Sequence, residues 1–402
     1  MRKFIPLGGR YKTMTNSTFT WAVVGAGPAG IAAVGKLMDH GISPKEIAWI
    51  DPAFMVGDFG TKWCKVSSNT RVRLFSKFYE ACRAFDYASA PEFDIQKTDP
   101  NTTCLLGLAA EPLRWITQQL QTKVQVFQSK AQQLKLRDRY WEISLSDIYP
   151  SPLKFWGCSQ PDSSSSHRID YAPGTHQVDA YPAPSNPMGI KVRAKNVILA
   201  TGAEPHSLSF PDVEEIHLST ALDPDKLNAA CDKEDTIAVF GSSHSAIIIL
   251  ENLIEKTNVK KVINFYLAPL RYAVYFEDWI LFDDTGLKGN AAIWARKHID
   301  GKLPDKLQRV ISDEENIRVT LPMCNKVVYA TGFQKRLVPV EGMRRLEYNA
   351  GSGIIAPGLF GFGIAFPEAK MDRFGTIEHR VGLWKFMEYI NSVMPVWLQY
   401  GT

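Results

Sequence analysis

The sequence predicts an α/β fold in which one unit of strand, glycine turn and helix lies inside the domain begun by another. Three observations carry this expectation. A glycine-rich turn at residues 25–30 follows an apolar strand and opens a helix, and a second turn at 241–246 repeats the arrangement. In addition, strands over 197–200 and 327–330 each run into an Ala-Thr-Gly turn. Strands that alternate with helices in this way favour parallel sheets.

The first unit spans residues 20–51. An apolar strand is expected to end at Val24, a helix to reach about His40, and a second strand to cover 46–50. Short apolar runs next to glycine favour strands, and the longer segment between them favours a helix. We therefore expect a βαβ unit at the start of the chain.

The turn of this unit has the composition of a dinucleotide-binding loop. Gly25 permits a tight turn, Gly27 lets the backbone approach a pyrophosphate, and Gly30 lets helix and strand pack closely. The helix N-terminus, where proline is favoured, directs unpaired N–H groups at phosphates. Asp51 lies at the distance from which a carboxylate reaches a ribose hydroxyl. These features predict a Rossmann-like domain. The expected cofactor contacts are Gly25, Gly27, Pro28, Ala29, Gly30 and Asp51.

The remainder of the N-terminal part is predicted to be helical and then rich in short strands. Helices are expected over 72–85 and 111–120. Strands over 124–127, 131–136 and 141–145 are expected to form a small antiparallel meander.

Residues 146–188 interrupt this pattern because they are rich in Pro, Ser and Gly. Connections longer than about 12–15 residues without secondary structure are uncommon inside compact domains. A solvated surface insertion and a functional lid are both open, and the insertion is favoured. Residues 1–13 are expected to form a flexible extension, with Met14 as an alternative start.

The C-terminal half is predicted to repeat the pattern of strand, turn and helix. A helix is expected from the turn at Gly241 to about Glu255, and a closing helix over 378–393. The expected strands cover 195–200, 236–240, 262–266, 316–320 and 326–330.

The second glycine turn is degenerate. Ser243 stands where the middle glycine of the first turn stands, so more side-chain bulk lies near any phosphate. Two interpretations are open: a nicotinamide nucleotide site at Gly241, Ser243 and Ala246, and a nucleotide-free helix turn capped by His244.

Basic residues follow the second turn. If a nucleotide binds, Lys260, Lys261 and Arg271 could neutralise a 2′-phosphate. NADPH is therefore slightly favoured over NADH.

The order of the two glycine turns and the two Ala-Thr-Gly turns resembles that of the two-dinucleotide-binding-domain flavoproteins. In that superfamily a smaller Rossmann-like NAD(P) domain is inserted into a Rossmann-like FAD domain. The resemblance implies an FAD domain over 14–205 and 325–402 and an NAD(P) domain over 206–324. It implies FAD at the first turn and a nicotinamide nucleotide at the second. It further implies cofactor contacts at Gly202, Gly332, Phe360 and Gly361.

Two segments after the first unit narrow the resemblance. Residues 60–63 and 66–70 resemble the Gly-x-x-Trp and Ser-Asn-Thr segments of flavin-containing monooxygenases, whose relatives include Baeyer-Villiger and N-hydroxylating enzymes. The resemblance implies that Trp63 lies beside the isoalloxazine. It also implies that Asn69 is catalytic, bonding the nicotinamide or a flavin hydroperoxide. The alternative is a polar turn over 68–70 that caps the helix beginning near Val72.

The implied function is an FAD-dependent monooxygenase that uses NAD(P)H and molecular oxygen. It would act through a flavin hydroperoxide on a small substrate containing a nitrogen, sulfur or carbonyl centre. An NAD(P)H:acceptor reductase of the quinone type is a second hypothesis. A non-catalytic flavin-binding regulatory protein is a third, because only residues 217–219 remain where the monooxygenases carry a Phe-x-Gly-x-x-x-His signature.

An aromatic cluster follows the second unit. Core packing is the favoured interpretation of most of its members, and the wall of a substrate pocket is the alternative. The cluster comprises Tyr272, Tyr275, Phe276, Trp279, Ile280 and Phe282.

Composition excludes several classes of partner. The net charge is +4, but Lys and Arg are scattered among acidic residues, so nucleic acid is not expected. The six cysteines form no C-x-x-C pair and no metal-ligand spacing, which argues against a dithiol enzyme and a bound metal. No signal-peptide core and no apolar run of roughly 18 residues is present, so we expect a cytoplasmic protein, compatible with a homodimer.

Overall fold

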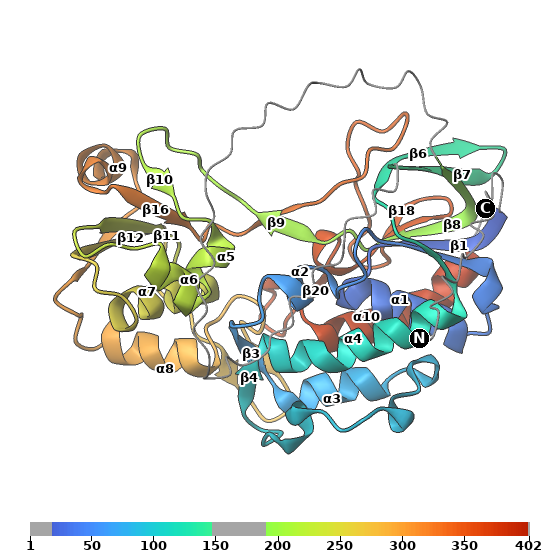
Figure 1. Ribbon diagram of the computed structural model, residues 1–402, viewed down its shortest axis with the longest axis horizontal. Coiled ribbons are helices and arrows are strands. Elements are labelled where there is room, and N and C mark those ends of the chain that lie inside the picture. The colour runs from blue at the N-terminus through green and yellow to red at the C-terminus, as the bar shows by residue number, and fades with distance from the viewer. Residues whose placement is uncertain (1–17, 147–189, 401–402) are drawn as a thin grey trace, which may run out of the picture.

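The computed structural model describes residues 18–146 and 190–400 of the 402-residue chain. The expected extension over 1–13 and almost all of the Pro-rich and Ser-rich insertion lie outside the described residues. Two lobes, the first built around a mixed sheet and the second around a parallel sheet, lie side by side (Figure 1). The predicted α/β fold with one domain nested in the other is confirmed.

The first lobe contains an eight-stranded sheet. Its central strand, β1, pairs in parallel with β2 on one side and with β8 on the other. In spatial order the main strands are β18 (Ile354–Ala356), β19 (Leu359–Gly361), β8 (Lys191–Leu199), β1 (Thr18–Val24), β2 (Ile47–Ile50) and β5 (Gln125–Phe127).

An antiparallel ribbon extends this sheet from its β8 side. β6 (Ala131–Arg137) pairs with β7 (Tyr140–Leu145), and β7 pairs with β8. The expected meander is therefore wrong in one member, because β5 instead pairs in parallel with β2. β5 follows a long helix and so returns to the sheet as a parallel strand.

The two faces of the first sheet are covered differently. Trp21 and Val23 pack with the helices, whereas Ala22 and Val24 pack with the antiparallel ribbon. This alternation is the period of a strand buried on both faces. The covering helices are α1 (Pro28–Asp39), α3 (Val72–Glu80), α4 (Leu106–Lys123) and α10 (Leu383–Gln399).

The second lobe contains a five-stranded sheet whose paired strands all run parallel. In spatial order the strands are β10 (Glu214–Glu215), β16 (Lys326–Tyr329), β11 (Thr236–Phe240), β12 (Lys261–Tyr266) and β15 (Leu307–Ile311). The helices of this lobe are α5 (Leu218–Ala221), α6 (Pro224–Ala229), α7 (His244–Glu255), α8 (Gly289–His298) and α9 (Glu314–Thr320).

The second lobe corrects two expectations. Residues 316–320 form part of α9 and not a strand, because the Asp313 carboxylate caps the helix by accepting from the Asn316 N–H.

β16 lies in the second sheet, so the expected domain boundary at residue 324 is too early. A strand belongs to the domain whose sheet it completes, and the second domain therefore continues through Tyr329.

The two lobes are joined by a short antiparallel ribbon. β9 (Ala203–Pro205) leaves the first lobe and β17 (Phe333–Lys335) returns to it, and the two strands pair. Figure 1 shows β9 crossing between the lobes. Each member follows one of the Ala-Thr-Gly turns, so these turns mark the points at which the chain changes lobe.

Short elements complete the fold. They are α2 (Gly57–Thr61), β3 (Ser67–Arg71), β4 (Thr103–Leu105), β13 (Val274–Tyr275), β14 (Ile280–Leu281), β20 (Glu368–Met371) and β21 (Ile377–Arg380). Because β21 occupies the start of the segment expected to be the closing helix, that helix begins at Leu383. Among residues 18–146 and 190–400, no helix is both long and apolar enough to cross a membrane.

Trp397 of α10 provides a test of the packing in the first lobe. Its ring stacks on Phe360 at a centroid distance of 4.9 Å, and its Nε1 donates to the Ser352 carbonyl at 2.6 Å. We expect Trp397→Ala to lower the free energy of unfolding in urea by about 3–5 kcal/mol. The neighbouring Val396→Ala, at a side chain 45% exposed, should change it by less than about 0.5 kcal/mol. Equal effects of the two substitutions would contradict this packing.

Candidate functional site

The three glycines of the first turn have three different surroundings. A Cβ on Gly25, whose φ is +110°, would lie 2.2 Å from the Ala200 carbonyl oxygen. A Cβ on Gly30 would lie 1.9 Å from the Gly25 carbonyl oxygen. A Cβ on Gly27 would meet no atom within 4 Å. The outer two glycines are therefore required by packing, whereas Gly27 borders open space.

The open space at Gly27 lies at the beginning of α1. Pro28 is the first residue of this helix, and no acidic residue lies in its first turn. The free N–H groups and partial positive charge of a helix N-terminus favour an anion. Gly57, at the start of α2, comes close to Gly27 from the other side, since its Cβ would lie 3.2 Å from the Gly27 Cα. The cradle thus fits the pyrophosphate of a dinucleotide.

Asp51 ties the end of β2 to the glycine turn. Its Oδ1 accepts from the N–H groups of Ala53 and Phe54 at 2.8 and 2.7 Å, and its Oδ2 accepts from the Ala26 N–H at 2.8 Å. A carboxylate oxygen can accept two hydrogen bonds, so Oδ2 keeps one acceptor position. Asp51 can therefore hold the turn and still receive a ribose hydroxyl.

Trp49 supports the same turn from β2. Its indole Nε1 donates to the Gly25 carbonyl at 3.0 Å, and the Gly25 N–H donates to the Ile50 carbonyl at 2.8 Å. The tryptophan is fully buried. Sequence patterns do not predict this role, because a tryptophan in an apolar strand is indistinguishable from an ordinary core residue.

The first Ala-Thr-Gly turn meets α2 and the returning ribbon through Arg336. The Arg336 N–H donates to the Gly202 carbonyl at 3.0 Å, and its guanidinium forms an ion pair with Asp58. The Thr201 hydroxyl donates to the Arg336 carbonyl. Sequence analysis did not select Arg336, because no residue near it in the sequence indicates that it lies against α2.

Trp63 lies where the two lobes meet. Its ring packs edge to face against Phe333 of β17 at a centroid distance of 6.3 Å, and it also contacts the apolar core of the second lobe. The expected position beside an isoalloxazine stays a prediction.

Asn69 lies in β3 and its side chain is exposed. The alternative interpretation of 68–70 as a helix cap is wrong, since α3 follows Arg71 and no side chain caps it. The Ser68 hydroxyl instead donates to the Thr70 carbonyl, within a strand that pairs with β4. In the described part of the chain, the Asn69 Oδ1 accepts from the Thr70 hydroxyl at 3.2 Å and its amide nitrogen has no hydrogen-bond partner. Its expected catalytic role stays a prediction.

The second glycine turn repeats the construction of the first. Gly241 has φ +126°, and its Cβ would lie 2.4 Å from the Ala330 carbonyl oxygen. Its N–H donates to the Phe265 carbonyl at 2.9 Å, and its carbonyl accepts from the Asn264 Nδ2 at 2.8 Å. Ser243, which precedes α7, is exposed. The turn is therefore geometrically intact despite its degenerate sequence.

The third position of this turn carries Ala246 in place of glycine. The residue is fully buried in the second lobe, and its Cβ would lie 3.4 Å from a Cβ on Gly241. Helix and strand therefore stand slightly farther apart here than at Gly30. An alanine in this position still permits close packing.

His244 connects the second turn to the first lobe. Its Nε2 lies 3.4 Å from the Ser67 carbonyl oxygen of β3, and its buried Nδ1 has no partner among the described residues. It does not cap α7, so the nucleotide-free interpretation loses the role that it gave to this side chain. Burial lowers the pKa of His244, and the positive charge of Lys288 lowers it further.

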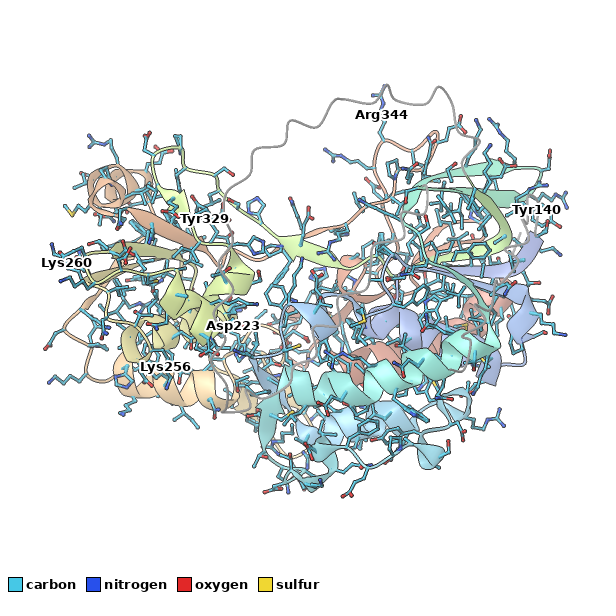
Figure 2. All side chains as sticks on the ribbon, viewed as in Figure 1. Tyr140, Asp223, Lys256, Lys260, Tyr329 and Arg344 are labelled. Carbon is cyan, nitrogen blue, oxygen red and sulfur yellow. The ribbon has the colours of Figure 1, made fainter. Side chains whose placement is uncertain are left out.

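Two of the basic residues expected near a 2′-phosphate are misplaced. Lys260 and Lys261 precede or begin β12, where both N–H groups donate to the Asp235 carbonyl. Nucleotides bind at the carboxyl ends of parallel strands, which is the opposite edge of the sheet. Figure 2 shows Lys260 on the outer side of the second lobe. Arg271, after the end of β12, lies with its guanidinium over the Phe282 ring at 4.6 Å.

Core packing involves both residues of the late strand β19 that were expected to contact a cofactor. Phe360 is fully buried between Trp21 and Trp397, so its side chain belongs to the core and cannot contact a cofactor. A Cβ on Gly361 would lie 2.4 Å from the Phe366 ring, so packing requires this glycine. Gly332, by contrast, has φ +102° and open space at its Cβ position.

Most of the aromatic cluster after the second unit is not core. Tyr275 and Phe276 are 52% and 46% exposed, and Phe276 stacks on Trp279 at 4.7 Å. Trp279 in turn contacts Phe374 of the loop between β20 and β21 at 5.5 Å. The favoured expectation of core packing is therefore wrong for most of the cluster, because these rings lie on two surface hairpins, whereas Tyr272 packs against the core of the second lobe. The Arg71 guanidinium lies 5.4 Å from the Tyr275 ring and links this surface to β3.

Comparison with known proteins gives one relative along almost the whole chain. Monooxygenase AgnR1 of Paecilomyces divaricatus is 30% identical over 413 aligned residues, which cover 94% of this chain and 97% of that protein. No family model matches the sequence.

Solved structures share the fold at low sequence identity. The ornithine N-hydroxylase of Kutzneria sp. 744 has a TM-score of 0.58 at 12% identity and covers 95% of this chain and 99% of its own. A flavin monooxygenase from Stenotrophomonas maltophilia has a TM-score of 0.56 at 14% identity, covering 96% and 99%. A bacillithiol disulfide reductase from Bacillus cereus has a TM-score of 0.54 at 13% identity, covering 95% and 99%. The fold is thus shared with flavoproteins of different activities.

His244 predicts a pH dependence of stability. Its pKa is lowered on folding, so the unfolded chain binds a proton more readily and stability falls as pH drops below the ordinary value of about 6.5. We expect the loss of unfolding free energy between pH 8 and pH 5.5 in urea titrations to be smaller for His244→Gln. The control His379→Gln, at an exposed histidine, should keep the wild-type loss. If His244→Gln loses as much unfolding free energy as the wild type, His244 is not the source of the pH dependence.

Proposed function

Because this chain belongs to the monooxygenase family that includes AgnR1, we propose that it holds FAD on the first lobe and uses NAD(P)H and molecular oxygen to oxygenate a small substrate. The observation that carries the FAD site is the open space at Gly27 between two glycines that packing requires. The substrate class that we propose contains a nitrogen, sulfur or carbonyl centre. Family membership favours this function over a quinone-type reductase and over a non-catalytic flavoprotein.

The residues of the first turn fit the adenosine diphosphate part of FAD. The N–H groups at the start of α1 would bind the pyrophosphate, with Gly27 leaving room for its oxygens. The free acceptor position of the Asp51 Oδ2 would receive a ribose hydroxyl. Pro28 and Ala29 shape the helix start, and Ala29 lies against Gly363, whose Cβ would be 2.5 Å from the Ala29 Cβ.

The residues that surround the reacting end come from both lobes. FAD, when bound, supplies the acceptor for a hydride and the means to activate oxygen. We propose that Trp63 forms an apolar wall there and that the exposed amide of Asn69 donates a hydrogen bond to a nicotinamide or to an oxygen-bearing group. Gly202 and Gly332 would leave room for the cofactors where the chain changes lobe.

The second turn would bind the nicotinamide nucleotide. Gly241 gives the tight turn, the exposed Ser243 borders the phosphates, and Ala246 allows α7 to approach the sheet. The turn lies against β3 through His244, so the nucleotide would be held on the side of the second lobe that faces Asn69.

Gly27→Val tests the FAD site without a packing penalty. Gly27 has φ −75°, which valine adopts, and its Cβ position is empty, so the apoprotein should fold with an unchanged thermal unfolding midpoint. The branched side chain should nevertheless fill the pyrophosphate space and abolish flavin binding, measured as flavin absorbance per protein after reconstitution. Gly351→Val, in an exposed loop, should retain full flavin content. Stoichiometric flavin in Gly27→Val would refute the assignment.

Asn69→Ala tests the proposed hydrogen bond at the reacting end. Because the side chain is exposed and its hydrogen bond among the described residues is to the neighbouring Thr70, the variant should fold and bind FAD normally. We expect a larger share of the NADPH consumed to appear as hydrogen peroxide, by roughly tenfold for the loss of one positioned donor. Peroxide yield and NADPH oxidation are measured together. Asn101→Ala, at an exposed asparagine near Arg73, is the control, and equal yields in both variants would remove Asn69 from the mechanism.

A further inference from the structure

The two glycine turns are equivalent by hydrogen bonding, and this equivalence identifies matching positions on β2 and β12. The Gly25 N–H bonds the Ile50 carbonyl, and the Gly241 N–H bonds the Phe265 carbonyl. The residue before each carbonyl donates a side-chain hydrogen bond to the glycine carbonyl, from Trp49 in one lobe and from Asn264 in the other. The residue after Ile50 is Asp51, so the residue after Phe265, Tyr266, occupies the matching place.

The matching place in the second lobe therefore carries an aromatic ring instead of a carboxylate. A carboxylate there receives the ribose 2′-hydroxyl and repels a 2′-phosphate. Tyr266 has neither property. A positively charged group lies on this ring, since the Arg309 guanidinium stands 4.1 Å from its centroid.

Arg309 is held rigidly and its charge is not neutralised by an ion pair in the described part of the chain. It comes from the neighbouring strand β15, in register with Asn264, and its Nε donates to the Asn264 Oδ1 at 2.9 Å. Its Nη2 is buried and has no hydrogen-bond partner among residues 18–146 and 190–400. The carboxylate of Asp300 accepts from the Tyr272 hydroxyl at 2.6 Å and acts on Arg309 through its charge, without an ion pair between the two among the described residues. A partly buried guanidinium with an unsatisfied donor is suited to an anionic ligand.

From this arrangement we infer that Arg309, stacked on Tyr266, is the group that selects NADPH over NADH by pairing with the 2′-phosphate of the adenosine ribose. This inference rests on the proposed function, because it requires the nicotinamide nucleotide to lie at the Gly241 turn. A guanidinium pairs with a phosphomonoester through charge-assisted hydrogen bonds, which a ribose hydroxyl cannot replace. Asn264 acts as a positioning residue that fixes Arg309 relative to the Gly241 carbonyl.

Isothermal titration of the FAD-loaded protein with NADP⁺ and with NAD⁺ tests the inference without turnover. The wild type should bind NADP⁺ more tightly than NAD⁺. Arg309→Ala should raise the dissociation constant of NADP⁺ by about tenfold to a hundredfold, as expected for the loss of a charged hydrogen-bonded pair. The dissociation constant of NAD⁺ should stay within about twofold of the wild-type value. Lys260→Ala, at the opposite edge of the same sheet, should bind both as the wild type does.

A second variant introduces a negative charge at the matching position. Tyr266→Asp recreates in the second lobe the carboxylate that Asp51 provides in the first. This variant should bind NADP⁺ at least about tenfold more weakly, because the carboxylate repels the phosphate. It should bind NAD⁺ as tightly as the wild type or more tightly, because the carboxylate accepts from the ribose hydroxyl.

The outcomes separate this inference from the proposed function. If the wild type binds both nucleotides equally, or if Arg309→Ala leaves NADP⁺ unchanged, the inference fails and the proposed function stands. If Arg309→Ala weakens both nucleotides equally, Arg309 only supports the turn and its role in selection is overturned. If the wild type binds neither nucleotide, both the inference and the proposed function fail.

Discussion

The fold depends on one contact made twice, between a glycine turn and the first carbonyl after a neighbouring strand. The Ala200 N–H donates to the Val24 carbonyl at 2.8 Å, and the Ala200 carbonyl then presses on Gly25 at a distance that excludes any Cβ. Ala330 repeats this arrangement with Phe240 and Gly241 in the second lobe. The Ala-Thr-Gly turns are thus the surfaces on which the glycine turns rest. Each then leads into the ribbon that joins the lobes.

Sequence patterns predicted the elements whose signals are local. The strand, turn and helix at each glycine turn needed only hydrophobic period and glycine position, and the structure has them at residues 18–39 and 236–255. The residues 316–320 were misassigned because their apolar content outweighed the capping Asp313 upstream. Lys260 was expected near the nucleotide but lies at the amino end of β12. The direction of a strand therefore decides which of its ends can meet a ligand.

The parts of the candidate site that sequence patterns do not predict depend on contacts between distant segments. Arg336 meets Asp58, and His244 meets Ser67, across long stretches of sequence. No local pattern marks such pairs, since either partner alone resembles a surface charge or a helix start. The contact between His244 and Ser67 also joins the second lobe to the first. A hydride donor on one lobe and its acceptor on the other must lie within about 3–3.5 Å, so inter-lobe contacts belong to the chemistry.

The central claim is that this member of the monooxygenase family activates oxygen on FAD with electrons from a nicotinamide nucleotide. The most direct test is a double-mixing stopped-flow measurement. FAD-loaded protein is first reduced by NADPH without oxygen and then mixed with oxygenated buffer, while the flavin spectrum is followed. We expect rapid loss of the oxidised spectrum, followed by a lasting species that differs from both reduced and oxidised flavin. Failure of NADPH to reduce the flavin, or an immediate return of the oxidised spectrum with stoichiometric peroxide, would contradict it.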